Sequence, residues 1–466
     1  MKPIDRNHND TGHRTEKKID KKGAGRRAYM TETPVPKLIL ELAVPTILSM
    51  LVTGIYNTAD TFFVGRISTQ ATAAVGLVFS VMAIIQAFGF LCGHGSGNYL
   101  SRMLGAGKMK EADEMASTGF AVSIIVGLAI MAAGLIFLDP FARFLGRGAT
   151  AGTIAETKRY MRIILLGAPF MTGQFVVNNQ LRFQGSAVYA MIGIMTGAAL
   201  NMILDPLLIF VFHMGVAGAA IATVSGQIIS FFVLLAGSLK GENIRLGISH
   251  VRINGHYLFE LINGGAPSLF RQGLASVAAI LLNSSAGAWG GDAAIAGMSV
   301  VSRVLMLISS SVIGFGQGFQ PVCSYNYGAG LKGRVKEGFY FSVKCTSAFL
   351  TACGILCFIF APQVISVFRN DPAVIEIGAF ALRCQMAVTP ILGTIFMGHM
   401  MLQSSGMGLK ATIASSARNG IFFIPLILIL PRIMGLTGVE LAQPAADVLT
   451  FLFTVPLLRS VLREMV

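Results

Sequence analysis

The feature that most constrains this chain is an apolar run of about 20 residues that recurs along almost its entire length. Runs of this length cross a bilayer as α-helices, because a spanning segment meets no water and must satisfy its own backbone hydrogen bonds. Only 12% of the residues are charged, about half of what a soluble chain carries. The two-residue alternation of a membrane β-barrel is absent. The chain is therefore predicted to be an all-α membrane protein.

Twelve segments are predicted to span the membrane. They lie at 38–63, 70–98, 113–138, 158–181, 187–212, 215–238, 257–287, 293–321, 337–360, 375–402, 410–431 and 438–460. Lys and Arg gather at the N-terminus and in the even-numbered connections, for example at Lys108, Lys240 and Lys332. Because positively charged loops stay in the cytoplasm, both termini are expected on that side.

Residues 1–36 are polar and basic, and their composition predicts a disordered cytoplasmic tail. This stretch has no apolar core of the signal-peptide kind, so it is expected to be retained. The net charge of +14 is also the kind of surplus that nucleic-acid-binding proteins carry. Here it is concentrated in the tail and in short loops, as in an inner-membrane protein, so no nucleic-acid partner is expected.

The sequence repeats itself at a nearly constant spacing. Three pairs of matching segments lie 220 to 223 residues apart: Gly-Ala-Gly at 105–107 and 328–330, Pro45 and Pro267, and 215–223 and 435–443. Each half holds six predicted spans, an even number, so both halves enter the membrane in the same orientation. Such parallel repeats are typical of transporter folds.

Two matching six-helix bundles imply a cleft that can open to either side of the membrane in turn, which is the physical basis of secondary transport. The expected organisation is the tail at 1–36, an N-lobe at 37–238, a cytoplasmic linker at 239–256 and a C-lobe at 257–466. No G-x-x-x-x-G-K-[ST] motif is present, so the energy is expected to come from an ion gradient. The six cysteines have no metal or disulfide spacing and are interpreted as small buried residues. No cofactor is expected.

Asn201 and Asp205 stand inside the apolar run "AALNMILDPLLIFVF", where an ionised carboxylate costs on the order of 3 kcal/mol. They are four residues apart and therefore share one helix face. At about 1.5 Å per residue, Asp60 and Thr223 come to the same outer depth in neighbouring spans. Their oxygens suit Na⁺, or a proton shared between carboxylates that resist joint ionisation. The alternative is that Asp205 only holds helices together, and the agreement in depth disfavours it.

Several segments resemble the multidrug and toxic compound extrusion (MATE) family of transporters. They are "YNTADTFFVGRI" in the first span, "NMILDPLLIF" in the fifth, "GVAGAAIAT" in the sixth and "GFQPVCSYNYGAG" in the eighth. The resemblance covers about residues 36–460, and "ARNGIFFIPLILILP" is similar to the MepA-like bacterial branch. It implies twelve helices in two lobes and antiport of drugs against Na⁺ or H⁺.

The resemblance also implies roles for individual residues. The N-lobe cation site of the family matches Asp60, Asn201, Asp205 and Thr223, and the proline near which its first helix bends matches Pro45. NorM-like members carry further acids in spans 7 and 10, which this chain lacks inside those spans. Coupling is therefore expected in the first lobe.

Other polar residues receive weaker interpretations. Arg418 and Asp447 are expected to form a structural ion pair across helices, and Arg271 and Arg303 are expected to be paired or to reach toward the membrane surface. The candidates for the cleft wall are Tyr56, Gln174, Asn178, Asn179 and His399.

Together these patterns predict a monomeric inner-membrane exporter of small amphipathic, cationic drugs. The alternative is a flippase of lipid-linked oligosaccharide or peptidoglycan precursors. Such flippases carry clustered Arg or Lys in the cleft, whereas the arginines of this chain are scattered along the sequence. An enzyme is disfavoured because no H-E-x-x-H motif or recognisable nucleophile is present.

Overall fold

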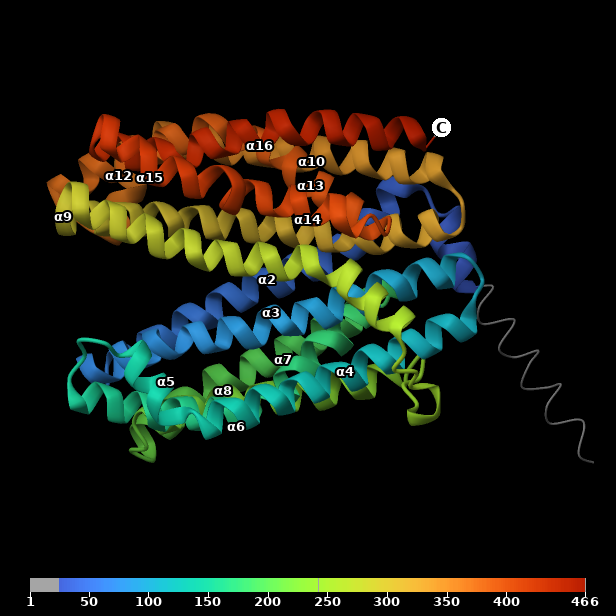
Figure 1. Cartoon of the computed structure of the whole chain (residues 1–466), viewed down its shortest axis with the longest axis horizontal. Coiled ribbons are helices and arrows are strands. Elements are labelled where there is room, and N and C mark those ends of the chain that lie inside the picture. Colours follow the sequence, from blue (N-terminus) through green and yellow to red (C-terminus); the bar gives the residue numbers. More distant parts are fainter. Residues whose placement is uncertain (1–24, 242, 466) are drawn as a thin grey trace, which may run out of the picture.

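The computed structural model describes residues 25–241 and 243–465, and almost all of them are helical. No strand occurs in this part of the chain, which confirms the predicted all-α class. Figure 1 shows two helical bundles, one formed by residues 35–238 and the other by residues 255–464. The bundles meet at the end of the molecule that carries the C-terminus and separate at the opposite end.

The first bundle consists of six long helices and a short one. They are α2 (Val35–Gly65), α3 (Thr69–Gly105), α4 (Met109–Ile136), α5 (Leu138–Leu145), α6 (Ala151–Phe183), α7 (Ala187–Pro206) with its π-helical continuation η1 (Leu207–Val211), and α8 (Val216–Ser238). The connection to the second bundle contains the 3₁₀ turn η2 (Ile248–His250).

Helices of the second bundle are more often interrupted. They are α9 (Gly255–Gly328), α10 (Lys332–Ile359), α11 (Ala361–Phe368), α12 (Pro372–Val388), η3 (Thr389–Ile391), α13 (Leu392–Ser404), α14 (Gly408–Ser416), η4 (Ala417–Phe422), α15 (Phe423–Met434) and α16 (Leu436–Glu464). The 3₁₀ turn η3 contains a proline, which cannot donate a helical hydrogen bond.

Among the described residues, eleven helical stretches are long and apolar enough to cross a membrane. One of them, α9, has 74 residues, or about 110 Å at the usual rise, far more than a bilayer of about 30 Å requires. Its helical geometry breaks at Gly291, with φ 63° and ψ −156°. Counting α9 as two spans restores the twelve predicted from the sequence, with the break between 287 and 293 as expected.

One expectation about a connection was wrong. Residues 139–158 were predicted as a loop, but they contain α5 and the first turns of α6. Thr150 explains the early start of α6, because its hydroxyl accepts a hydrogen bond from the backbone N–H of Thr153 at 3.3 Å and caps the helix. Ser68 caps α3 in the same way.

Part of the N-terminal stretch is ordered rather than disordered. Residues 25–32 are helical, and Met30 is fully buried in the largest apolar cluster. Asn326 of α9 donates to the carbonyl of Met30 at 3.1 Å. The prediction of a disordered tail therefore fails for these residues because they pack on the bundle. Its remaining part, residues 1–24, lies outside the described residues.

Equivalent positions of the sequence repeat have the same backbone conformation. Gly215 and Gly435 start α8 and α16 with nearly the same dihedral angles, φ 57° and ψ −136° against φ 61° and ψ −136°. Gly107 and Gly330, in the matching turns that follow α3 and α9, have φ 77° and 76°. Since only glycine adopts such positive φ values at low cost, the repeat is conformational as well as sequential.

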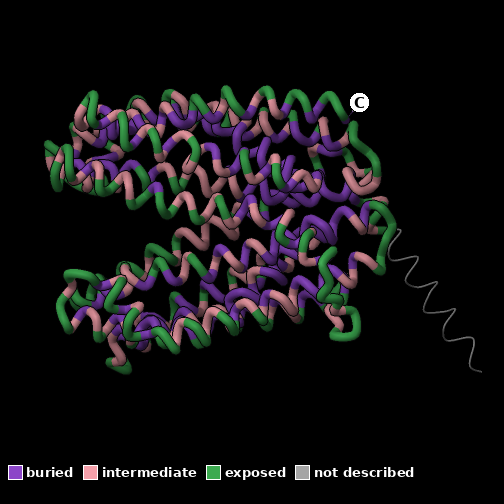
Figure 2. Tube along the Cα trace, in the orientation of Figure 1, coloured by how far each residue is buried: buried purple, intermediate pink, exposed green. Residues whose placement is uncertain are grey.

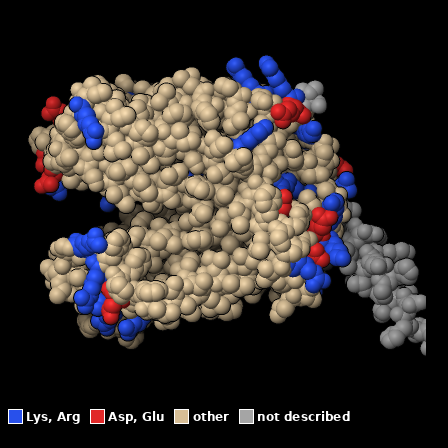
Figure 3. Space-filling model, in the orientation of Figure 1, with Lys and Arg blue, Asp and Glu red and all other residues tan. Residues whose placement is uncertain are grey.

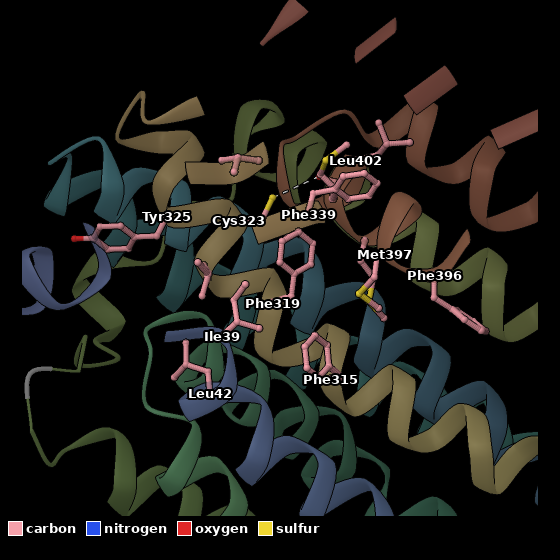
Figure 4. Close-up of a cluster of buried hydrophobic side chains, with 14 of the residues drawn as sticks. Ile39, Leu42, Phe315, Phe319, Cys323, Tyr325, Phe339, Phe396, Met397 and Leu402 are labelled. Carbon is pink, nitrogen blue, oxygen red and sulfur yellow. Dashed lines mark hydrogen bonds between the residues drawn. The ribbon is translucent and has the colours of Figure 1, made fainter. Parts of the chain in front are cut away.

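The largest apolar cluster lies where the two bundles meet. Ile39 and Leu42 of α2 pack with Phe315 and Phe319 of α9 and with Met397 of α13 (Figure 4). Figure 2 shows that buried residues are dense at this end and that exposed ones dominate the ends of the separated bundles. The packed end therefore holds the two halves together.

The outer surface fits a membrane. The middle of the face in Figure 3 is free of charged side chains, which gather toward the two ends. Large apolar side chains are exposed on the surface of the protein, including Phe62, Ile125 and Ile429. All six cysteines are free, but only Cys92 and Cys323 are buried. The other four are partly exposed, contrary to the sequence interpretation, because an apolar thiol can face lipid as easily as a core.

Candidate functional site

Two carboxyl groups meet inside the first bundle. Asp60 of α2 and Asp205 of α7 lie close enough to each other to interact electrostatically. Asp205 is fully buried, and one oxygen of each carboxyl group, Oδ1, is buried with no hydrogen-bond partner in the described part of the chain. Buried carboxylate oxygens without partners are unfavourable unless a proton or a cation compensates them.

Asn201 and Thr223 complete this cluster. With its amide turned toward Asp205, Asn201 donates to Asp205 Oδ2 at 3.2 Å and accepts from the backbone N–H of Thr223 at 3.2 Å. The two residues are 3% and 4% exposed. The four residues that the sequence analysis grouped by depth are thus brought together by α2, α7 and α8.

Two tyrosines surround the carboxyl pair. Tyr56, one helical turn before Asp60, lies close enough to both acids to interact with them electrostatically. Tyr160 of α6 does the same. Sequence reasoning missed the second tyrosine. It lies near the start of its helix, and no spacing relates it to the acids.

The ligand set favours a monovalent ion or a proton. Among the described residues, no group of three or more His, Cys, Asp and Glu side chains is placed to hold a metal ion. The cluster offers two carboxyl groups with neutral amide and hydroxyl oxygens, which fits Na⁺ or a shared proton better than a transition metal.

A cavity of about 210 Å³ adjoins this cluster. Asn201 and Thr223 belong to its wall, so the carboxyl pair lies directly behind it. The wall is formed by α2, α3, α6, α7 and α8 of the first bundle, and by α9 of the second. Phe90, Phe175 and Met191 supply apolar surface, as is usual in sites for small organic ligands.

The structure places the five cleft candidates differently. Tyr56, Gln174 and Asn178 line the cavity. Asn179 and His399 are buried but do not line it. Asn179 donates to the carbonyl of Phe175 at 2.7 Å, and the ring of His399 lies 3.1 Å from the carbonyl of Ile395.

Two arginines also line the cavity, and the sequence analysis had placed neither there. The fourth predicted span ended at residue 181 and left Arg182 in the following connection, but α6 extends through it and the residue is 5% exposed. Arg271 was expected to be paired or to reach the membrane surface. Instead it lies on the cavity wall contributed by α9. Both residues lie on helix faces that turn inward, which spacing along the sequence does not reveal.

Arg418 and Asp447 form the expected ion pair in the second bundle. Arg418 Nε donates to Asp447 Oδ1 at 2.7 Å and Nη2 donates to Oδ2 at 3.3 Å. Gln385 and Gln443 donate to the same carboxylate, at 2.7 and 3.0 Å. Asp447 is fully buried, so its negative charge is compensated within the bundle.

Helices that span a membrane in two related bundles, with a cavity beside a buried carboxyl pair, define a multi-pass membrane transporter. The chain belongs to the family described as MatE, whose model matches residues 45–207 and again 267–429. The two matches begin 222 residues apart, as Pro45 and Pro267 do. This confirms the family that the sequence motifs resemble.

Relatives cover nearly the whole chain. The multidrug export protein MepA of Staphylococcus aureus (strain N315) is 30% identical over 413 residues, which are 88% of this chain and 90% of that protein. The protein of the same name from Staphylococcus haemolyticus is 28% identical. A solved structure described as the outward-facing conformation of a multidrug resistance MATE family transporter superposes with a TM-score of 0.88 at 25% identity, covering 94% of this chain and 98% of that one. These comparisons support a multidrug efflux transporter of the bacterial cell membrane.

Proposed function

We propose that this chain exports amphipathic drugs bearing a cationic group by antiport against Na⁺ or H⁺ across the cytoplasmic membrane. One observation carries the proposal. The carboxyl groups of Asp60 and Asp205 meet behind Asn201 and Thr223, and the latter two also line the cavity. An ion site and a drug site therefore share one wall.

Coupling follows from charge at this shared wall. While the carboxyl pair is ionised, it attracts the cationic group of a drug in the cavity. Once Na⁺ or a proton occupies the pair, that attraction is lost and the drug is released. Two ligands that weaken each other's binding at adjoining sites have a positive, unfavourable coupling free energy, which is what exchange requires.

We further propose that residues 37–238 and 257–466 act as two lobes that rock about the packed end, connected by residues 239–256, with both termini in the cytoplasm. Pro45, buried inside α2, is the proposed bending point. Thr46 next to it donates to the carbonyl of Gly314 in α9 at 2.6 Å, so a bend there would move α2 against the second bundle. One chain supplies both lobes and the cavity wall, so a monomer suffices.

Dye transport in proteoliposomes tests the proposal. A sodium gradient and a proton gradient are imposed separately on vesicles loaded with a fluorescent cationic dye. One gradient should drive dye movement, and neither should do so in the Asp205→Asn variant. Dye movement at the same rate with and without either gradient would contradict antiport. Movement of a lipid-linked pyrophosphate without any dye movement would favour the flippase alternative.

A further inference from the structure

The cavity has an unexpected charge. Among the described residues that line it are two arginines, Arg182 and Arg271, and no aspartate or glutamate. The ring of His94, which is 3% exposed, lies close enough to both guanidinium groups to interact with them electrostatically. The central space between the bundles is therefore electropositive, although a carboxyl pair lies behind its opposite wall.

Two amide side chains hold Arg182 in this position. It donates to the side-chain oxygens of Gln317 and Asn179, which are neutral acceptors. Its Nε is buried with no partner in the described part of the chain. A buried guanidinium bonded only to amides keeps an uncompensated positive charge, which is costly inside a protein.

Arg271 faces the same space from the second bundle. It makes no hydrogen bond and no ion pair within residues 25–241 and 243–465, and it is partly exposed at the cavity wall. Its neighbour Gln272 reaches Gln86 of α3 across the bundles at 3.4 Å, so this stretch of α9 touches the first bundle. Two guanidinium groups from different bundles thus line the same cavity, and neither forms an ion pair within the described residues.

Uncharged side chains fill the rest of the wall. Gln174 and Asn178 offer amide hydrogen bonds, and Phe90 and Ile194 offer apolar contact. Asn201 and Thr223 separate the cavity from the acids. A ligand that fits these surfaces has an apolar body, an anionic group at the arginines and a cationic group toward the carboxyl pair.

We propose that the preferred substrates are zwitterions, in which a carboxylate or phosphate is held between Arg182 and Arg271 while the cationic end faces the wall of Asn201 and Thr223. This rests on the proposed efflux function and narrows its substrate class. Guanidinium groups bind such anions through two parallel hydrogen bonds. A ligand that carries only a cationic group cannot form these bonds, which are the strongest interaction that the cavity offers.

Binding of a matched dye pair to the purified full-length protein tests this inference. One dye carries a delocalised cation and a free carboxylate, and the other is its methyl ester, which lacks the negative charge. Fluorescence anisotropy should show the acid binding about tenfold or more tightly than the ester, as expected for a charge-assisted hydrogen bond.

The variant Arg271→Gln should remove this difference in affinity, and Arg271→Lys should keep part of it. Arg303→Gln, which changes an exposed arginine of α9 outside the cavity wall, should leave it intact.

Three outcomes would overturn the inference. They are equal affinity of the wild type for acid and ester, equal weakening of both dyes by Arg271→Gln, and competition by a polyprenyl pyrophosphate more than about tenfold stronger than the dye itself. The last result would identify a lipid-linked phosphate as the ligand. Because binding is measured without an ion gradient, failure of antiport in vesicles would not alter these results.

Discussion

Gly105 of α3 lies so close to the backbone of Tyr325 in α9 that a Cβ atom on it would stand 2.0 Å from the Tyr325 carbonyl oxygen. The equivalent glycine of the second half makes the reciprocal contact: a Cβ atom on Gly328 of α9 would stand 2.0 Å from the carbonyl oxygen of Arg102 in α3. Arg102 also donates to Glu260 of α9 at 2.8 Å. The two bundles therefore close on each other, backbone against backbone, at the end that carries the C-terminus.

Adding one methyl group at this contact should prevent closure. Real Cβ atoms almost never approach another atom within 3.0 Å, so Gly105→Ala or Gly328→Ala should force α3 and α9 apart. Spin labels at Lys110 and Lys332, in a cysteine-free background, should report a longer distance, and drug resistance should fall. Gly273→Ala is the control, because nothing lies within 4 Å of its Cβ position. Unchanged distances in both variants would show that the contact is not needed for closure.

Neutralising the carboxyl pair should uncouple transport without unfolding the protein. Asp205→Asn keeps the side-chain shape but cannot bind a cation by charge or release a proton. A coupling free energy of about 1–3 kcal/mol would be lost, so resistance in a transporter-deficient host should fall to background. Asp139→Asn, in the short helix α5 outside the spans, is the control. Full resistance with Asp205→Asn at normal membrane levels would refute the assigned role.

The sequence predicted what lies along each helix better than what lies between helices. The spans and the repeat follow from apolar runs and glycine spacing, which local physics determines. Asp60 and Asp205 could be grouped because depth in the membrane follows from residue count. The presence of Arg182 and Arg271 on the wall of one cavity could not be predicted, because it depends on how α6 and α9 rotate about their axes and on which faces turn inward. Tyr160 was missed for the same reason.

Breaking the buried ion pair of the second bundle should destabilise the protein. Arg418→Gln leaves the fully buried Asp447 carboxylate with only the two glutamine donors, and such a change costs about 3 kcal/mol. The double variant with Asp447→Asn removes the uncompensated charge and should recover much of the loss. Thermal unfolding in detergent measures both. A double variant as unstable as the sum of the two single variants would show that the charges do not interact.

Breaking the exposed ion pair between Lys158 and Asp139, in contrast, should not destabilise the protein. The hydrogen bond from the Lys158 ammonium group holds the pKa of Asp139 below its ordinary value. A lowered carboxyl pKa stabilises the fold at neutral pH, and this contribution is lost only as the pH falls through the lowered value. The Asp139 side chain is 67% exposed, so solvent screens the interaction. Asp139→Asn should leave Tm unchanged at neutral pH, and a clear drop would contradict this assignment.

Replacing Gly291 of α9 by alanine should destabilise the protein through backbone strain alone. Its φ of 63° and ψ of −156° fall in a region that essentially only glycine occupies. Nothing lies within 4 Å of its Cβ position, so alanine there meets no steric clash with a neighbour. Gly291→Ala should therefore lower the free energy of unfolding by the backbone strain alone, about 1–3 kcal/mol, which is measured as a lower Tm.

Gly273→Ala is the control. This position is equally free of neighbours but helical, so the variant should keep or raise Tm because alanine favours a helix. Equal Tm values for the two variants would mean that α9 can run straight through residue 291, and the division of its 74 residues into two membrane spans would then need another cause.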